Sequence, residues 1–145
     1  MQYQGGKSRI ASHIVSKIRE MYPTATEIWE PFCGGGAVTL ALAKAGFRVH
    51  ASDSHEDLIL MWQALMRGET APFADVTEAE HAALRTAAPS ARRGFVGFGA
   101  SFGGGWWNGG VDRGSRLTEI NQPPVRFTVT MAVTAPDPVV PEKFT

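Results

Sequence analysis

The sequence has a single cysteine, Cys33, no excess of either charge, and no hydrophobic run long enough for a membrane helix. One cysteine excludes an internal disulfide and any metal cluster built on several thiolates, and the four histidines show no ligand spacing. Lys+Arg 14 and Asp+Glu 14 give a net charge of +0, so the overall charge does not indicate a nucleic-acid partner. No signal peptide opens the chain. We therefore expect a cytoplasmic protein with no membrane and no metal partner.

Glycine and proline are distributed unevenly along the 145 residues. Nine of the 16 glycines lie between Gly94 and Gly114, and five of the nine prolines lie beyond Asn121. A first half of ordinary α/β character thus gives way to a glycine and aromatic stretch, and then to a tail rich in proline and valine. No internal repeat is visible. The hydrophobic content of 43% and charged content of 19% are those of a globular chain.

Hydrophobic periodicity and glycine punctuation predict the elements of the first half. Ser8 is expected to cap the first helix, and Gly46 and Gly68 to end the second and third. Strand, glycine loop, helix, strand, acidic residue and helix follow one another, which predicts parallel strands. The predicted elements are a helix over 7–21, a strand over 26–30, a loop over 32–36, a helix over 37–45, a strand over 47–52 and a helix over 57–67.

The second half gives weaker local signals. Thr77 and Glu80 match a capping box, which predicts a helix running to about Ala88, before Pro89. From Ser90 onward the pattern predicts loops and short strands. One later strand is expected, because Val125, Phe127, Val129, Met131 and Val133 alternate with other residues, but the sequence does not place this strand in a sheet.

Two glycine motifs have different value as ligand signals. Gly5-Gly6-Lys7-Ser8 resembles the end of a phosphate-binding loop, but Met1 stands where the first glycine belongs, which excludes that interpretation. Gly34-Gly35-Gly36 follows a strand and opens a helix, and Asp53 ends the next strand, where an acidic residue accepts hydrogen bonds from a ribose diol. The alternative is that the glycines serve tight turns and Asp53 caps a helix.

Three motifs in order resemble the Dam-type adenine-specific DNA methyltransferases. They are Tyr3-Gln4-Gly5-Gly6-Lys7, then Glu30-Pro31-Phe32-Cys33-Gly34-Gly35-Gly36-Ala37-Val38, then Ser52-Asp53 with Asp57-Leu58-Ile59. The segment 97–110 is similar to a phage and bacterial subgroup, and the likeness covers roughly Gln2 to Arg116. It implies a Rossmann-like α/β fold that binds S-adenosylmethionine, and methyl transfer to adenine in double-stranded DNA, as in restriction–modification systems. The implied cofactor residues are Tyr3, Lys7, Phe32, Gly34, Gly35, Gly36 and Asp53.

The likeness also suggests how the chain is divided. Residues 1–76 are expected to form the cofactor-binding part, 77–117 a helix and the start of the target-recognition region, and 118–145 an unassigned tail. Four arginines, Arg92, Arg93, Arg113 and Arg116, flank the aromatics of 94–116 and predict a DNA-facing surface. The alternative for that stretch is a glycine-rich segment with buried aromatics. Cys33 is interpreted as a small packed residue, since no activating neighbour is evident.

The family's acceptor motif, D-P-P-Y, is missing. Asn121-Gln122-Pro123-Pro124-Val125 has an amide where the acid belongs and valine where the aromatic belongs, and Asp137-Pro138-Val139 fails as well. No catalytic residue can therefore be assigned. We expect a truncated or divergent enzyme with an incomplete sheet, because the family places the D-P-P-Y strand beside the first strand. A complementing C-terminal fragment is the expected partner. The alternative is a non-catalytic remnant that binds S-adenosylmethionine or DNA.

Overall fold

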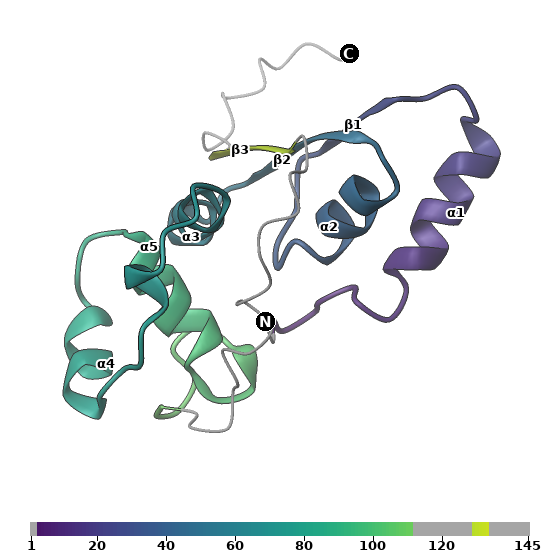
Figure 1. Ribbon diagram of the computed structural model, residues 1–145. Coiled ribbons are helices and arrows are strands. Elements are labelled where there is room, and N and C mark those ends of the chain that lie inside the picture. Colours follow the sequence, from purple (N-terminus) through teal and green to yellow (C-terminus); the bar gives the residue numbers. More distant parts are fainter. Residues whose placement is uncertain (1–2, 112–128, 134–145) are drawn as a thin grey trace, which may run out of the picture.

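The computed structural model describes residues 3–111 and 129–133 of the chain. Three parallel strands form its sheet in the order β1-β2-β3, with β1 spanning Glu27–Glu30, β2 Arg48–Asp53 and β3 Val129–Val133 (Figure 1). Ile28 is opposite Val49, and Ala51 is opposite Met131. The parallel arrangement expected of the first two strands is confirmed. Within the described strands β2 is central, and β1 pairs with β2 alone.

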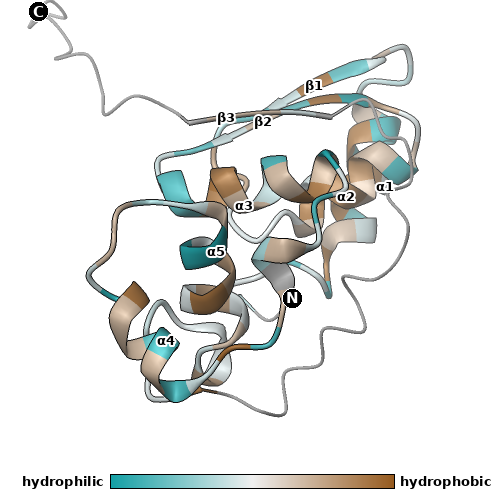
Figure 2. Cartoon of the chain, turned by 60° about the vertical axis from the view of Figure 1, so that its left-hand side comes forward, coloured by the Kyte–Doolittle hydropathy of each residue, from teal (hydrophilic) through white to brown (hydrophobic). Residues whose placement is uncertain are grey.

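The main helices lie together on one face of this sheet (Figures 1 and 2). Strand β2 alternates accordingly, because Val49 and Ala51 are buried while Arg48 is exposed and His50 is half-buried. On the opposite face the Trp29 ring stacks on His50 at 4.6 Å and remains 67% exposed. The helices on the covered face are α1 (Ala11–Met21), α2 (Ala37–Lys44) and α3 (Glu56–Met66).

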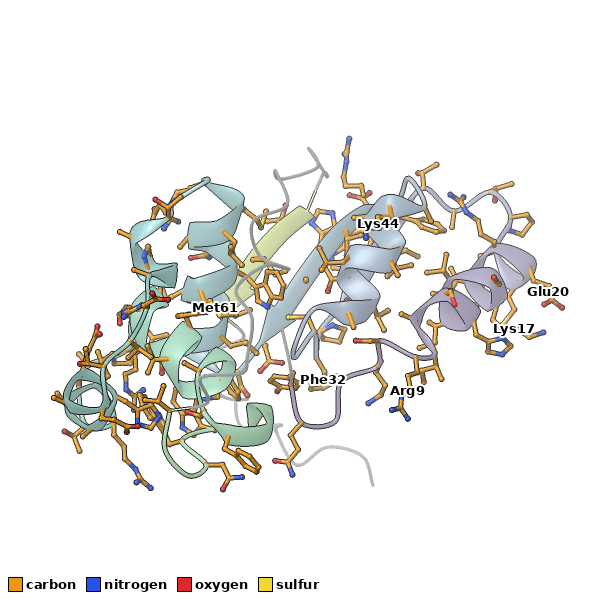
Figure 3. The ribbon with its side chains drawn as sticks, turned by 60° about the horizontal axis from the view of Figure 1, so that its bottom comes forward. Arg9, Lys17, Glu20, Phe32, Lys44 and Met61 are labelled. Atoms are coloured by element: carbon orange, nitrogen blue, oxygen red, sulfur yellow. The ribbon has the colours of Figure 1, made fainter. Side chains whose placement is uncertain are left out.

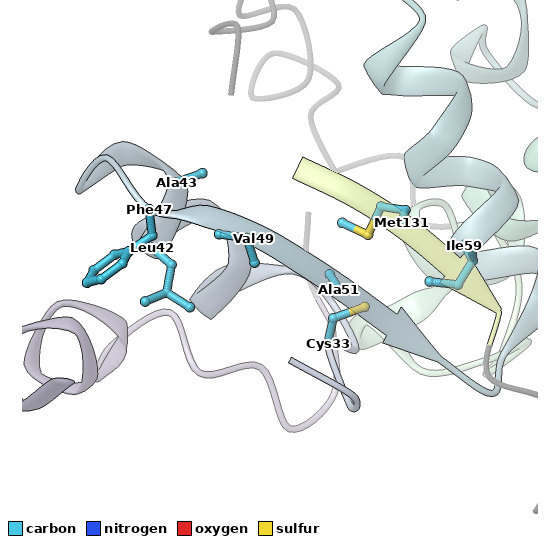
Figure 4. Packing of buried hydrophobic residues seen from close by; sticks show 8 residues of the cluster. All are labelled: Cys33, Leu42, Ala43, Phe47, Val49, Ala51, Ile59 and Met131. Carbon is cyan, nitrogen blue, oxygen red and sulfur yellow. The ribbon is translucent and has the colours of Figure 1, made fainter. Parts of the chain in front are cut away.

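The core between the sheet and these helices is one of two hydrophobic clusters. Its buried members come from β2, β3, α2, α3 and the loops around them (Figure 4). They are Cys33, Leu42, Ala43, Phe47, Val49, Ala51, Ile59 and Met131. Helix α1 packs against this cluster through Val15 and Ile18, and its outer side carries the exposed Lys17–Glu20 ion pair (Figure 3). None of the described helices is long and apolar enough to cross a membrane.

Two helix limits differ from those expected from the sequence. Helix α1 begins at Ala11 with Ile10 at its N-cap and no side-chain cap, so the predicted Ser8 cap is wrong. Residues 8–10 form a turn instead, held by the Ile10 amide donating to the Lys7 carbonyl at 3.0 Å. Helix α4 spans Glu78–Leu84 and ends before Ala88, although Thr77 Oγ1 accepts from the Glu80 amide as the capping box predicted.

Residues 91–99 are helical, which corrects the prediction of loops and short strands there, whereas residues 105–111 form turns and loops as predicted. Ser90 caps α5 (Ala91–Gly94), which continues into the π-helix η2 (Phe95–Gly99). Gly94 permits this packing, because a Cβ there would lie 2.2 Å from the Asp57 carbonyl oxygen of α3. Glycine disfavours an isolated helix but allows two backbones to approach closely. The short 3-10 helices η1 (Ala71–Phe73) and η3 (Phe102–Gly104) complete this part.

The second cluster joins α3 to α5 and η2. Its buried members are Leu58, Met61, Ala64, Phe95, Val96, Phe98 and Trp107, and Trp62 contacts both clusters. Strand β3 comes from the tail that the sequence left unassigned, and it pairs with β2 in the same sheet. Gln63 Nε2 of α3 donates to the Met131 carbonyl at 2.9 Å, which fixes β3 against that helix. Val125 and Phe127 of the predicted strand lie outside the described residues.

Candidate cofactor site

The glycine loop connects β1 to α2 at the carboxyl end of the sheet. Gly34 and Gly36 have φ values of +50° and +71°, which favour glycine. All three glycines also face aromatic rings of the chain itself. A Cβ on Gly35 would lie 2.7 Å from Tyr3 Cβ, and one on Gly36 would lie 2.8 Å from the Trp62 ring. The triplet therefore serves close internal packing as well as a sharp turn.

Asp53 holds this loop at the end of β2. Its Oδ2 accepts from the Gly34 amide at 2.9 Å, and its Oδ1 accepts from the His55 amide at 3.0 Å. The N-cap of α3 is His55, so Asp53 is not itself the cap that the alternative interpretation supposed. A carboxylate has about four acceptor positions. Two of them are used here, so each oxygen keeps capacity for a ligand hydroxyl.

The N-terminus of α2 faces the same loop. Gly36 occupies its N-cap position without a side-chain hydrogen bond, and the first turn has no acidic residue. The initial amides of a helix favour a carboxylate or phosphate. A diol acceptor beside an uncapped helix start suits a ligand that carries both a ribose and a carboxylate.

Four rings beside Asp53 form what we call the aromatic wall: Tyr3, His55, Phe98 and Trp106. The centroid of Tyr3 lies 5.1 Å from that of Phe98, and Phe98 lies 4.6 Å from Trp106. The His55 ring packs edge-on against Trp106 at 4.3 Å and against Phe98 at 4.9 Å. Among the described residues, His55 Nδ1 is a buried polar atom without a hydrogen-bond partner.

Burial keeps two titratable groups of the site protonated. It raises the pKa of the Tyr3 phenol, and the negative charge of Asp53 adds to the increase. The pKa of the Cys33 thiol is raised to about 12 by burial, then by Asp53 and Glu30. Cys33 is 5% exposed and stays a thiol at neutral pH, which agrees with its interpretation as a packed residue.

Two predicted cofactor residues lie at the surface. Phe32 is 86% exposed (Figure 3). Lys7 is exposed, and its Nζ donates to the Gly5 carbonyl at 3.0 Å. The structure thus brings Tyr3 and Asp53 onto the glycine loop, whereas cofactor contact by Phe32 and Lys7 stays a prediction.

Sequence reasoning missed His55, Trp62 and Trp106. His55 comes two residues after Asp53, and no motif in the sequence marks this position as part of a site. Trp62 lies within the predicted helix 57–67, but its contact with Gly36 depends on tertiary structure. Trp106 lies against Gly97, where a Cβ would come within 2.3 Å of its ring. The sequence offers one weak signal for the two tryptophans: Gly36 and Gly97 leave room for large rings, but it does not say which rings fill that room.

The arginines predicted to contact DNA have other partners. Arg92 binds both carboxylate oxygens of Glu80, at 2.9 and 2.8 Å, and donates to the carbonyls of Pro72, Ala74 and Asp75. Arg93 pairs with Asp57 at 2.5 Å. The Arg92 and Arg93 side chains are 19% and 16% exposed. Arg92 donates five internal hydrogen bonds and Arg93 three, so both side chains take part in internal packing, and their contact with DNA stays a prediction.

The aromatics of the glycine-rich stretch divide into two groups. Phe95, Phe98 and Trp107 are buried, as the alternative interpretation expected. Phe102 is 66% exposed, and Trp106 is half-buried. Arg113 and Arg116 lie outside the described residues. Within residues 3–111 and 129–133, no three His, Cys, Asp or Glu side chains gather as a metal site would require.

The mixed helix and strand architecture, with its small parallel sheet, is compatible with an S-adenosylmethionine-dependent methyltransferase fold. A comparison with protein-family models identifies the family. Residues 3–98 match the family described as D12 class N6 adenine-specific DNA methyltransferase, and the chain belongs to that family. No curated protein and no solved structure matched the chain significantly.

Proposed function

We propose that this chain is the donor part of an adenine-specific DNA methyltransferase and binds S-adenosylmethionine at the glycine loop. The observation that carries the proposal is the Asp53–Gly34 hydrogen bond, which fixes an acidic side chain and the start of α2 beside each other at the carboxyl ends of β1 and β2. Ligands of open α/β sheets bind at such carboxyl ends. The family match covers all of these residues.

The residues present fit the cofactor. The free acceptor positions of Asp53 suit the ribose diol, and the uncapped start of α2 suits the carboxylate of the methionine part. The half-buried members of the aromatic wall, Tyr3, His55 and Trp106, are proposed to offer ring surface to the cofactor, and the Tyr3 phenol offers a donor. S-adenosylmethionine supplies an electrophilic methyl group, which the exocyclic amino group of adenine attacks.

We propose that the part of the enzyme that binds the adenine is supplied by another segment. The printed sequence contains no D-P-P-Y, and both near-matches lie outside the described residues. A flipped adenine needs acceptors for its amino hydrogens and an aromatic face, since its amino lone pair is delocalised into the ring. We propose that a C-terminal segment of the same family supplies both. We propose that a strand of this segment pairs with the outer edge of β1, because among the described strands β1 pairs with β2 alone.

Double-stranded DNA in the cytoplasm of a bacterium, or of a cell infected by a phage, is the proposed substrate. Phe102 is the proposed base contact on the described surface, because its ring is 66% exposed. Arg113 and Arg116 are the proposed phosphate contacts, since Arg92 and Arg93 are bound internally. Neutralising one arginine that binds a phosphate reduces the slope of log affinity against log salt by about one unit.

Transfer of labelled methyl groups to double-stranded DNA tests the proposal. The 145-residue chain alone is expected to give no transfer, and a co-expressed fragment bearing a family D-P-P-Y segment is expected to restore it. The control is the same fragment with its motif tyrosine replaced by alanine. Transfer by the chain alone would show that its own residues form an acceptor site. The second candidate is a non-catalytic binding remnant, which the missing motif favours. Cofactor binding without transfer in any combination would support that candidate.

A further inference from the structure

We propose that Arg93 is a positioning residue for the cofactor site, acting through Trp106 on His55 and thus on the segment that carries Asp53. This inference rests on the proposed function. It assigns to Arg93 a role other than the DNA contact that local charge had suggested.

The first step is the ion pair of Arg93 with α3. Arg93 Nη1 lies 2.5 Å from Asp57 Oδ2, and the Asp57 side chain is 5% exposed. Asp57 Oδ1 also accepts from the Ser90 amide at 2.8 Å, which joins the start of α5 to the start of α3. The pair is therefore shielded from water and held at both ends, unlike a surface ion pair.

The second step is the rest of the guanidinium. Its Nε and Nη2 donate to the carbonyls of Leu84 and Arg85, at 3.0 and 3.1 Å, at the carboxyl end of α4. Acceptors of α3 and of the end of α4 thus hold the plane of the group in one orientation. Arginine can satisfy such a set of acceptors with its fixed fork, whereas lysine has a single nitrogen.

The third step leads to the site. The Arg93 guanidinium lies over the Trp106 ring, 5.0 Å from its centroid. Trp106 packs edge-on against His55 at 4.3 Å, and the His55 amide donates to Asp53 Oδ1. A fixed guanidinium therefore fixes the indole, and the indole fixes the turn that orients the Asp53 carboxylate.

Arg92 provides a matched control. It is the adjacent residue of the same helix, has a similar exposed fraction and makes a comparable set of internal bonds, with Glu80 and the carbonyls of residues 72, 74 and 75. These bonds lead to residues 72–75 and to α4, and none of their acceptors belongs to the aromatic wall. Loss of either guanidinium is expected to destabilise the fold. Only the loss of the Arg93 guanidinium is expected to alter the cofactor site.

The experiment compares R93K and R92K for S-adenosylmethionine affinity by calorimetry, at a temperature where circular dichroism shows both to be folded. R93K is expected to bind about tenfold or more weakly than wild type, since small misplacements of positioning groups have such effects. R92K is expected to stay within about twofold, as sites without shared contacts behave independently. Equal effects of the two substitutions would overturn the inference and leave Arg93 a structural residue.

Trp106→Phe covers the case in which R93K does not fold. It keeps the Arg93–Asp57 pair and puts a smaller ring in place of the indole that contacts both Arg93 and His55. It is expected to weaken binding as R93K does, and wild-type affinity of the folded variant would overturn the inference. The proposed function fails separately, and this inference with it, if the folded wild-type chain itself does not bind S-adenosylmethionine.

Discussion

Replacing Asp53 by alanine is expected to weaken cofactor binding and the glycine loop together. The substitution removes the acceptor of both the Gly34 and the His55 amides, at 2.9 and 3.0 Å. Hydrogen bonds to a charged acceptor contribute about 1.5–3 kcal/mol each when buried, and the lower end applies to this half-buried pair. A loss of about 3 kcal/mol follows, which lowers the melting temperature by roughly 10 °C for a domain of this size.

The effect on binding is a separate quantity. Loss of the diol acceptor is expected to cost about 1–3 kcal/mol, which is roughly a 5- to 150-fold weaker affinity for S-adenosylmethionine. Asp53→Asn gives an intermediate case, because its amide oxygen can still accept from one of the two backbone amides. Its melting temperature should fall about half as far as that of the alanine variant.

Thermal unfolding and calorimetry of the wild type and the two variants measure these effects. A melting temperature unchanged in Asp53→Ala would contradict the assignment of Asp53 as the support of the loop. Reduced stability with unchanged affinity, measured where all three proteins are folded, would contradict the ribose contact and leave Asp53 a structural residue.

Three further predictions concern ionisable groups. Cys33 should react with thiol reagents about a thousandfold more slowly in the folded chain than in urea, because its pKa is about 12 instead of 9.0. A rate near that of the unfolded chain would contradict the burial of Cys33 in a closed loop. Burial raises the pKa of Glu30 above 4.5, so the ionised carboxylate lowers the stability of the fold. Glu30→Gln should therefore raise the melting temperature at pH 7 and give no gain at a pH below 4. The hydrogen bond from Arg92 lowers the pKa of Glu80, so its contribution is present above pH 4.5 and is lost as the pH falls. Glu80→Gln should therefore destabilise the chain at pH 7 and less so in acid, and an equal effect at both pH values would contradict the role of that ion pair.

The sequence predicts β1, the glycine loop, α2, β2 and α3 well because their signals are local. Periodicity and positive-φ glycines such as Gly46 and Gly68 act within a few residues of the elements that they delimit. The order of these elements is enough to bring Asp53 beside Gly34, since both follow neighbouring parallel strands.

The rest depends on partners far along the chain. Asp57 and Arg93 are separated by 36 positions, and a local count of arginines cannot reveal that internal carboxylates neutralise them. The helix after Ser90 contradicts the local preference of its glycines because Gly94 packs on Asp57. Strand β3 has a clear alternating pattern, but its place beside β2 is set by α3 through Gln63.

Direct binding of labelled S-adenosylmethionine to the purified, folded chain tests the central claim most directly. We predict saturable binding that S-adenosylhomocysteine displaces, that ATP at equal concentration does not, and that Asp53→Ala weakens by the factor given above. S-adenosylhomocysteine shares the ribose and the carboxylate that Asp53 and the start of α2 are proposed to hold, whereas ATP shares the ribose alone. A folded chain that binds neither ligand, or that binds both equally through a site insensitive to Asp53, would contradict the proposed cofactor site.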